Sequence, residues 1–101
     1  MRTSRIEAAT PIAENVVVTE DTLGVDLSDG RSISVPLAWF PRLVQATAQE
    51  RENWRLIGRG VGIHWEDLDE DISVETLLLG LPSGESQASF QKWLAAKLSG
   101  N

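Results

Sequence analysis

The sequence predicts an α+β domain: an antiparallel β-sheet, made of a three-stranded N-terminal meander and a later hairpin, packed with short helices and a C-terminal amphipathic helix. Two patterns support this fold class. Short β-type runs separated by turn residues fill residues 15–35 and recur on both sides of Gly58-Arg59-Gly60. Apolar residues at spacings of three and four recur near the C-terminus, as on one face of a helix. The length of 101 residues fits one domain with one core.

The domain is expected to follow a short arm. Residues 1–13 mix small, charged and proline residues without periodicity, which predicts a flexible N-terminal arm. The single α+β domain then spans residues 14–98, and residues 83–98 form its C-terminal helical extension.

The strands of the meander can be aligned by register, because opposed residues of antiparallel strands share a face of the sheet. A two-residue loop at Asp29-Gly30 would mix apolar and polar residues on each face. A three-residue loop with Gly30 in a left-handed conformation avoids this mixture and is preferred. With a two-residue turn at Glu20-Asp21, the three strands share one apolar face. The expected pairs are Val16–Val25, Val18–Leu23, Val25–Ile33 and Leu23–Val35.

Helical segments are expected between the meander and the later hairpin. Pro36 ends the third strand because it has no N–H for the ladder, and Phe40-Pro41 suits the start of a helix. Thr47 and Glu50 have the spacing of a capping box, so two short helices should meet near Thr47. The apolar stripe of this segment consists of Leu37, Phe40, Leu43 and Val44.

The later hairpin is expected to turn at Arg59-Gly60. A two-residue loop there pairs Trp54 with Trp65 and places both on one apolar face with the pair Leu56–Ile63, while His64 points to the other face. The acidic residues 66–71 are interpreted as a loop that leads into a short helix.

Two further helices are expected toward the C-terminus. Ser73 is expected to cap a short helix that Gly80 and Pro82 end. The final helix is expected over about residues 86–98.

Composition limits the classes of function. The chain has no cysteine, which excludes disulfides, thiolate chemistry and cysteine-ligated zinc. It has neither the apolar region of a signal peptide nor about 18 consecutive apolar residues, so a cytoplasmic location and no membrane partner are expected. The net charge of −6 repels a phosphate backbone, so no nucleic acid partner is expected. Arg51, Arg55 and Arg59 are the one candidate for a basic face, and salt bridges to the acidic loop are their preferred role.

An acid–base or metal site can be considered at the single histidine. His64 could act as a general base oriented by Glu66 or Asp67. It could also be one ligand of a metal site completed by the carboxylates of residues 66–71, which would suit magnesium better than zinc. A lone histidine on a strand is more often structural or exposed, so no catalytic residue or metal ligand is assigned.

A calcium loop can also be considered in the acidic segment. Asp67, Asp69 and Asp71 match the first three acidic positions of an EF-hand loop. The glycine and the bidentate glutamate that the loop requires are replaced by Ile72 and Leu78. A solvated acidic loop before a helix is the preferred interpretation, and no cofactor is predicted.

The final helix carries four large apolar residues on one stripe. They are Phe90, Trp93, Leu94 and Leu98. The stripe could close the core of the domain, or it could dock on a second subunit or a partner protein. The four residues are therefore the candidate interface.

Four segments carry a likeness to a known family: Asp29-Gly30, Phe40-Pro41-Arg42-Leu43, Gly62-Ile63-His64-Trp65 and the run from Asp69 to Gly80. In these segments the chain resembles the domain-of-unknown-function family 2442, a set of small bacterial and phage proteins. The likeness covers about residues 14–82. It implies a compact α+β domain of antiparallel strands and short helices, with no established activity and no catalytic residues to assign. Some members resemble small partner proteins, including antitoxins, so the resemblance implies a binding role.

The function expected from these observations is a non-enzymatic protein-interaction domain. It is expected to self-associate as a homodimer or to bind a small protein partner in the manner of an antitoxin. The alternative is a small metal-dependent or acid–base site at His64 with the acidic loop 66–71.

Overall fold

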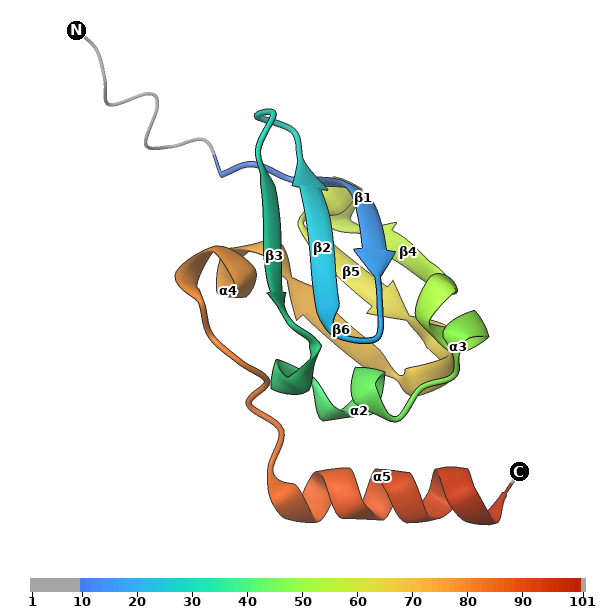
Figure 1. Ribbon diagram of the computed structural model, residues 1–101. Helices are drawn as coiled ribbons and strands as arrows, with labels where there is room; N and C mark the ends of the chain where they lie inside the picture. Colours follow the sequence, from blue (N-terminus) through green and yellow to red (C-terminus); the bar gives the residue numbers. More distant parts are fainter. Residues whose placement is uncertain (1–9, 101) are drawn as a thin grey trace, which may run out of the picture.

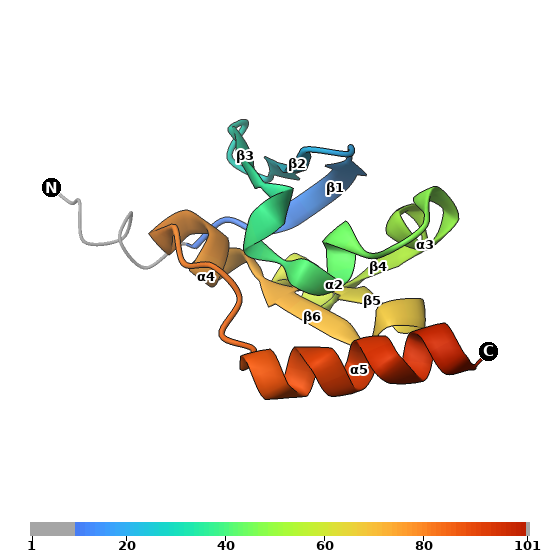
Figure 2. The ribbon, with the colours of Figure 1, turned by 60° about the horizontal axis from the view of Figure 1, so that its bottom comes forward.

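A computed structural model describes residues 10–100 of the chain, as two three-stranded antiparallel sheets, short helices and one longer C-terminal helix. The α+β fold class is therefore confirmed. The two sheets lie in two layers around one core, and the C-terminal helix lies outside both layers (Figures 1 and 2). The strands are β1 (Ala13–Val18), β2 (Thr22–Leu27), β3 (Ser32–Pro36), β4 (Trp54–Ile57), β5 (Gly62–Trp65) and β6 (Glu70–Ser73). The α-helices are α2 (Pro41–Val44), α3 (Ala48–Glu52), α4 (Val74–Leu79) and α5 (Gln87–Ser99), and the 3₁₀ turns are η1 (Leu37–Trp39), η2 (Gly58–Gly60) and η3 (Glu66–Leu68).

The first sheet has the order β1-β2-β3 and the register that the sequence predicts. Val25 lies opposite both Val16 and Ile33, and Leu23 lies opposite both Val18 and Val35. The three-residue loop is also confirmed, because the N–H of Leu27 donates to the carbonyl of Arg31 at 2.8 Å and Gly30 has a φ of 93°.

The first strand begins earlier than the arm prediction allows. Ala13 is buried and pairs with Leu27, beyond a register shift between Ala13 and Asn15. The N–H of Ser28 donates to the carbonyl of Ile12, which extends the pairing by another residue. Residues 12 and 13 are therefore part of the folded domain. Of the rest of the predicted arm, residues 10 and 11 are described and belong to no helix or strand, and residues 1–9 lie outside the described residues.

The short helices after β3 begin where the sequence predicts. Pro41 occupies the first position of α2. At α3, the Thr47 hydroxyl accepts from the N–H of Glu50 at 3.1 Å, and the Glu50 carboxylate accepts from the N–H of Thr47 at 2.9 Å. The capping box is therefore confirmed, and it separates α3 from α2. Three residues of the predicted stripe are buried, whereas Val44 is exposed.

The second sheet has the order β4-β5-β6, so the predicted hairpin is part of a three-stranded sheet. The pairs Trp54–Trp65 and Leu56–Ile63 are confirmed. The interpretation of residues 66–71 as a loop is wrong for its last two residues, because Glu70–Ser73 forms β6. The composition of β6 is not typical of a strand, because its only large apolar residue is Ile72. Ile72 lies opposite Ile63 of β5. Pairing with β5 therefore stabilises a strand that local propensity does not favour.

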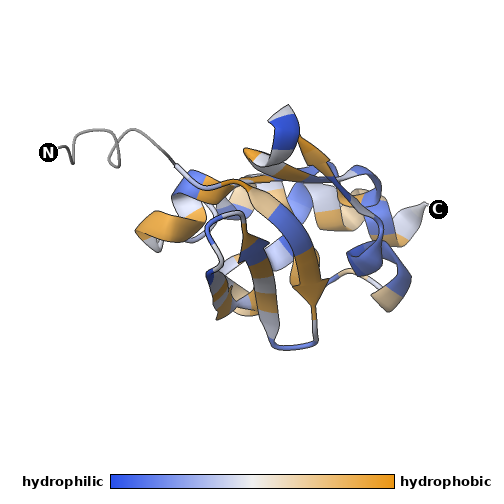
Figure 3. Cartoon of the chain, turned by 90° about the horizontal axis from the view of Figure 1, so that it is seen from above, coloured by the Kyte–Doolittle hydropathy of each residue, from blue (hydrophilic) through white to orange (hydrophobic). Residues whose placement is uncertain are grey.

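One hydrophobic core joins both sheets and the short helices. Apolar and polar residues alternate along β2 and β3, and α4 carries a run of apolar residues (Figure 3). The buried side chains are Ala13, Val16, Leu23, Val25, Leu27, Val35, Leu37, Phe40, Leu43, Ile63, Trp65, Leu68, Ile72, Val74 and Leu77. Within residues 10–100, none of the helices is long and apolar enough to cross a membrane.

The cap predicted at Ser73 is confirmed, and Ser86 caps the last helix as well. The hydroxyls of Ser73 and Ser86 accept backbone N–H groups at the starts of α4 and α5, and Gly80 ends α4 with a φ of 73°. The core-closing interpretation of α5 holds only at Trp93, which packs half-buried against the core, and none of the residues of α5 is buried. The two sheets, α2 and α4 already enclose the core, so α5 packs on the outside of this domain.

Candidate functional site

The outer face of the second sheet holds a row of charged residues across three strands. Arg55 of β4 lies opposite His64 of β5, which in turn lies opposite Asp71 of β6. The His64 ring contacts two carboxylates: Nδ1 lies 2.5 Å from Asp71, and Nε2 lies 3.0 Å from Glu66. Glu66 also forms an ion pair with Arg55 at 3.5 Å. The strand register therefore brings together residues that alternate in charge.

The two carboxylates favour the charged form of the histidine. The hydrogen bond to Asp71 is the largest cause that raises the pKa of His64, and Glu66 adds to it, whereas burial opposes the shift. A general base or a metal ligand needs a free ring nitrogen with a lone pair. Both nitrogens of His64 face carboxylates, so either role would first have to break one of these contacts.

The three aspartates of the calcium motif do not converge. Asp67 accepts from the Asn53 side chain at 2.9 Å, and Asp71 contacts His64. Asp69 lies in a left-handed turn with a φ of 52° at the end of η3. No group of three metal-binding side chains occurs within the part of the chain that the structure describes. The turn and the start of β6 direct the three carboxylates to different surroundings.

The three arginines of the candidate basic face are also separated. Arg51 donates to the carbonyls of Leu43 and Val44 and so binds the end of α2. Arg55 forms the predicted bridge to the acidic segment, through Glu66. Arg59 lies in the turn between β4 and β5, with a φ of 61°. No common face is formed by these residues.

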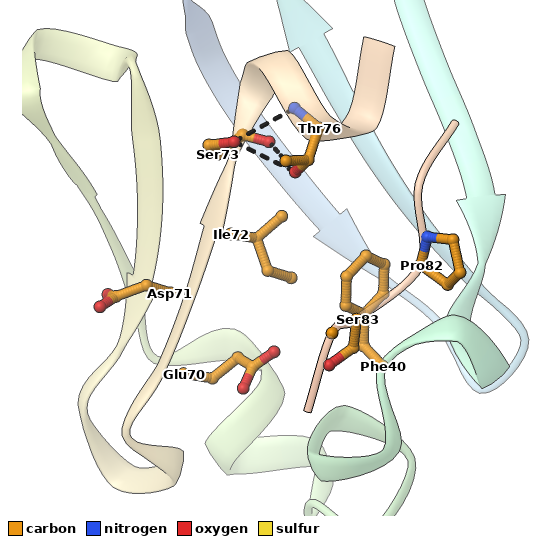
Figure 4. A pocket seen from close by; sticks show the side chains of 9 residues that line it. Phe40, Glu70, Asp71, Ile72, Ser73, Thr76, Pro82 and Ser83 are labelled. Carbon is orange, nitrogen blue, oxygen red and sulfur yellow. Dashed lines mark hydrogen bonds between the residues drawn. The ribbon is translucent and has the colours of Figure 1, made fainter. Parts of the chain in front are cut away.

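A pocket of about 310 Å³ opens beside the free edge of β6 (Figure 4). Its wall combines the second sheet, the start of α4, the ring of Phe40 and the segment that leads to α5. The lining residues are Phe40, Glu70, Asp71, Ile72, Ser73, Thr76, Pro82, Ser83 and Gly84.

Glu70 is the one residue of this lining whose carboxylate points into the pocket, because the Asp71 side chain turns to the opposite face (Figure 4). Glu70 lies opposite Trp65 and therefore belongs to the apolar face of the second sheet. Burial raises the pKa of Glu70 to about 7, although the charge of Arg42 opposes the shift. Sequence reasoning missed this residue because it missed β6. One feature of the sequence could have revealed it: Glu70 and Ile72 are two residues apart, so they would share a face if this segment formed a strand.

Arg42 is a second residue whose role the sequence did not reveal. Its guanidinium forms an ion pair with Glu85 at 2.6 Å and donates to the carbonyls of Leu68 and Asp69. It also lies 5.1 Å from the centroid of the Trp93 ring, in a cation–π contact. The Glu85 carboxylate raises the pKa of Arg42, and the guanidinium lowers the pKa of Glu85. Arg42 thus joins α2, the turn before β6 and α5.

A second ion pair holds the other end of α5. Lys97 lies 2.8 Å from Glu50 of α3, and it also lies 5.9 Å from the centroid of the Trp93 ring. This lysine is the largest cause that lowers the pKa of Glu50. A hollow of about 330 Å³ remains beside this contact, lined by Glu50, Asp67, Trp93, Ala96 and Lys97. The helix is therefore held by charged and aromatic contacts rather than by a closely packed apolar face.

The candidate interface residues of α5 divide into two groups. Phe90 and Trp93 are half-buried and stack on each other with ring centroids 5.9 Å apart, and Trp93 packs against the core. Leu94 is half-buried, whereas the side chain of Leu98 is 76% exposed. Leu98 is the most exposed large apolar residue in the described part of the chain.

Comparisons with known proteins agree with this fold and assign no activity to it. A family model described as "Protein of unknown function (DUF2442)" matches residues 13–83. The crystal structure of a protein of unknown function from Rhodospirillum rubrum is similar, with a TM-score of 0.65, 27% identity and coverage of 79% of this chain and 96% of that chain. No curated protein matches the chain significantly.

A second solved structure extends the likeness toward the C-terminus. The solution NMR structure of an uncharacterized protein from Chromobacterium violaceum has a TM-score of 0.65 and 21% identity, and the match covers 93% of this chain and 83% of that chain. Because the match covers 93% of this chain, it must include part of α5, so the shared fold extends into this helix.

Proposed function

We propose that this chain, which belongs to the DUF2442 family of proteins of unknown function, is a non-enzymatic domain that binds another protein through α5. The observation that carries the proposal is the attachment of α5. Ion pairs and one aromatic side chain hold the helix on the rest of the domain, while Leu98 stays 76% exposed and Leu94 is half-buried. An apolar flank that the chain's own core does not cover is available to a partner.

The flank has a spacing that suits a second helix. Phe90, Leu94 and Leu98 follow one another at intervals of four residues, which places them on one ridge of α5. Ridges of this spacing pack into the grooves of a neighbouring helix in the commonest class of helix packing. The ridge therefore supports docking of α5 as a helix on the surface of a partner.

Charge favours a second copy of the chain as the partner. All fifteen acidic residues lie outside α5, whereas α5 carries Lys92 and Lys97 and no acid. A positive helix on a chain of net charge −6 is complementary to the acidic body of another copy. Lys97 already pairs with Glu50 inside the same chain, so the exposed Lys92 is the side chain available for this contact.

The alternative function at His64 has less support from the geometry. The histidine, Glu66 and Asp71 satisfy one another, and Glu66 also pairs with Arg55. The wall of the nearby pocket is formed by the opposite face of the sheet and not by His64. We therefore interpret the row as a contribution to the stability of the second sheet.

Sedimentation of the full chain tests the proposal. We expect a dimer that dissociates in Leu94→Glu and Leu98→Glu variants, because a carboxylate on the ridge would be buried in the interface. Val17→Glu is the matched control, since Val17 is exposed on β1 and away from α5, and it should remain dimeric. A native chain that stays monomeric at every concentration, or a Val17→Glu variant that dissociates equally, contradicts the proposal.

A further inference from the structure

The pocket beside β6 has the size of a site for one side chain or a small ligand. Its volume of about 310 Å³ lies at the lower end of the about 300–1,000 Å³ that ligand pockets occupy. Phe40 and Ile72 form apolar walls, and Pro82 closes the side toward the segment that leads to α5 (Figure 4). The concave surface is therefore mainly apolar around one acidic group.

The acidic group, the Glu70 carboxylate, forms no hydrogen bond and no ion pair with residues 10–100. The nearest cation, Arg42, has its guanidinium on Glu85, Leu68 and Asp69. No lysine or arginine lines the pocket. A carboxylate placed on an apolar face without a partner is costly to ionise, so a cation brought into the pocket would gain a strong contact.

The backbone of β6 adds a second acceptor to the same wall. Val74 donates to the carbonyl of Val61, which makes this a hydrogen-bonded pair of the β5–β6 ladder. Such pairs alternate along antiparallel strands, so the carbonyl of Asp71 points away from β5. Because β6 is an edge strand, this carbonyl faces the pocket side of the sheet. Asp71 lines the pocket together with Glu70, so this carbonyl is an acceptor available to a donor bound there.

The remaining wall is held in place by backbone hydrogen bonds. The N–H of Ser83 donates to the carbonyl of Trp39 at 3.0 Å, and the N–H of Leu81 donates to the carbonyl of Thr76 at 3.0 Å. The N–H of Glu85 donates to the Ser83 hydroxyl at 3.1 Å. The segment that covers the pocket is thus tied to η1 and α4, and the pocket is formed before any ligand binds.

We propose that this pocket binds the guanidinium or ammonium group of a basic side chain, with Glu70 as its counter-ion, the Asp71 carbonyl as a second acceptor and Phe40 as an aromatic wall. A planar guanidinium matches this set best, because it presents several N–H donors in one plane and packs against apolar and aromatic surfaces. The proposal rests on the proposed function only for the source of the group, which is a basic residue of the bound protein.

The amides of N-acetylarginine and N-acetylcitrulline are the probes for this site, because they have similar shapes and only the first carries a charge. In a titration followed by NMR, we expect saturable shifts of the Glu70, Ile72 and Ser83 amides with the arginine probe alone. The shifts should disappear in Glu70→Gln and persist in Glu75→Gln, which removes the same charge from an exposed position on α4. Equal shifts with the citrulline probe, or unchanged shifts in Glu70→Gln, overturn the proposal.

The pH dependence of probe binding is a second test of the contact with Glu70. The charged groups around Glu70 are Arg42, Glu85, Asp69 and Asp71. Since the pKa of Glu70 is about 7, affinity for the arginine probe should be about tenfold higher at pH 8 than at pH 6. His64 lies on the opposite face, and His64→Gln should leave this ratio unchanged. A ratio that stays near one overturns the role of Glu70.

The pocket and the α5 interface can fail independently, and the Leu98→Glu variant distinguishes them. The Leu98→Glu variant should bind the arginine probe as the native chain does, because Leu98 does not line the pocket. If the native chain is monomeric and still binds the probe, the α5 interface fails and the pocket stands. If the chain is dimeric and does not bind the probe, the pocket fails and the interface stands.

Discussion

Arg42 and Glu85 lie 43 residues apart in the sequence and form an ion pair at 2.6 Å with side chains that are only 14% and 12% exposed. Arg42 follows the proline that begins α2, and Glu85 precedes the serine that caps α5. The pair therefore connects the family domain to its C-terminal extension, and the cation–π contact with Trp93 continues the same connection along α5.

Glu85→Gln should loosen α5 and lower the free energy of unfolding by about 2 kcal/mol, because a mostly buried guanidinium loses its charged partner. Glu85 has a folded pKa below 4.5, so its contribution is present above pH 4.5 and is lost as the pH falls through the folded value. Urea unfolding at pH 7 and at low pH, with amide exchange of α5, measures both effects. Glu52→Gln, an exposed change on α3, is the control and should cost little. Equal losses in the two variants would contradict a special role for the pair.

Glu70→Gln should make the folded chain more stable at pH 8, by roughly 1–2 kcal/mol after allowance for partial exposure. The folded pKa of Glu70 is about 7 and its ordinary value is 4.5. Between these values the folded chain keeps a proton that the unfolded chain has released, so stability falls as the pH rises through this window. Thermal unfolding from pH 4 to pH 8 measures the difference between variant and native chain. A constant difference across this range would show that Glu70 is not responsible.

His64 should titrate above its ordinary pKa of 6.5 in the folded chain. Its ion pairs then stabilise the fold fully below pH 6.5, and this contribution is lost as the pH rises through the folded pKa. NMR of the ring protons should show a midpoint that falls strongly in Asp71→Asn and less in Glu66→Gln, because Asp71 is the larger cause of the shift. A native midpoint at 6.5 would mean that the row is not formed in solution.

Gly60→Ala should destabilise the chain by about 3 kcal/mol, because strain and a steric clash act together. Gly60 has a φ of 103°, and a Cβ atom there would lie 2.6 Å from the carbonyl oxygen of Ala13. Gly30→Ala tests strain alone, since Gly30 has a φ of 93° and open space around it, and should cost about 1 kcal/mol. Gly84→Ala has neither feature and should be nearly neutral. Chemical denaturation ranks the three variants, and equal costs would rule out the close approach of β1.

The elements that could be predicted from the sequence are those with strong local signals. The loop at Gly30 and the pair Val25–Ile33 follow from alternation alone, because a shift of one residue would expose the whole apolar face. The capping box at Thr47 follows from two side chains three residues apart. The strand β6 could not be predicted in this way, since two of its four residues are acids and its pairing depends on β5.

The site residues show the same division. His64 was correctly placed on the face opposite Trp65, because a strand alternates its side chains. Its contacts with Asp71 required the register between β5 and β6. Sequence reasoning did not identify Glu70, the acidic group of the pocket, or Arg42, which attaches α5 to the domain. Both depend on partners far away in the sequence, which no local pattern reveals.

The sequence by itself determined the fold class, the turns and the caps of this protein, because these depend on backbone preferences and on neighbours within a few residues. Only the tertiary structure decided which charges meet and which apolar residues stay exposed. Arg42 meets Glu85, Glu70 faces a pocket, and Leu98 remains uncovered, because the packing of the two sheets sets those distances. Bringing distant segments together costs loop-closure entropy that no local pattern offsets, so these contacts depend on the whole fold.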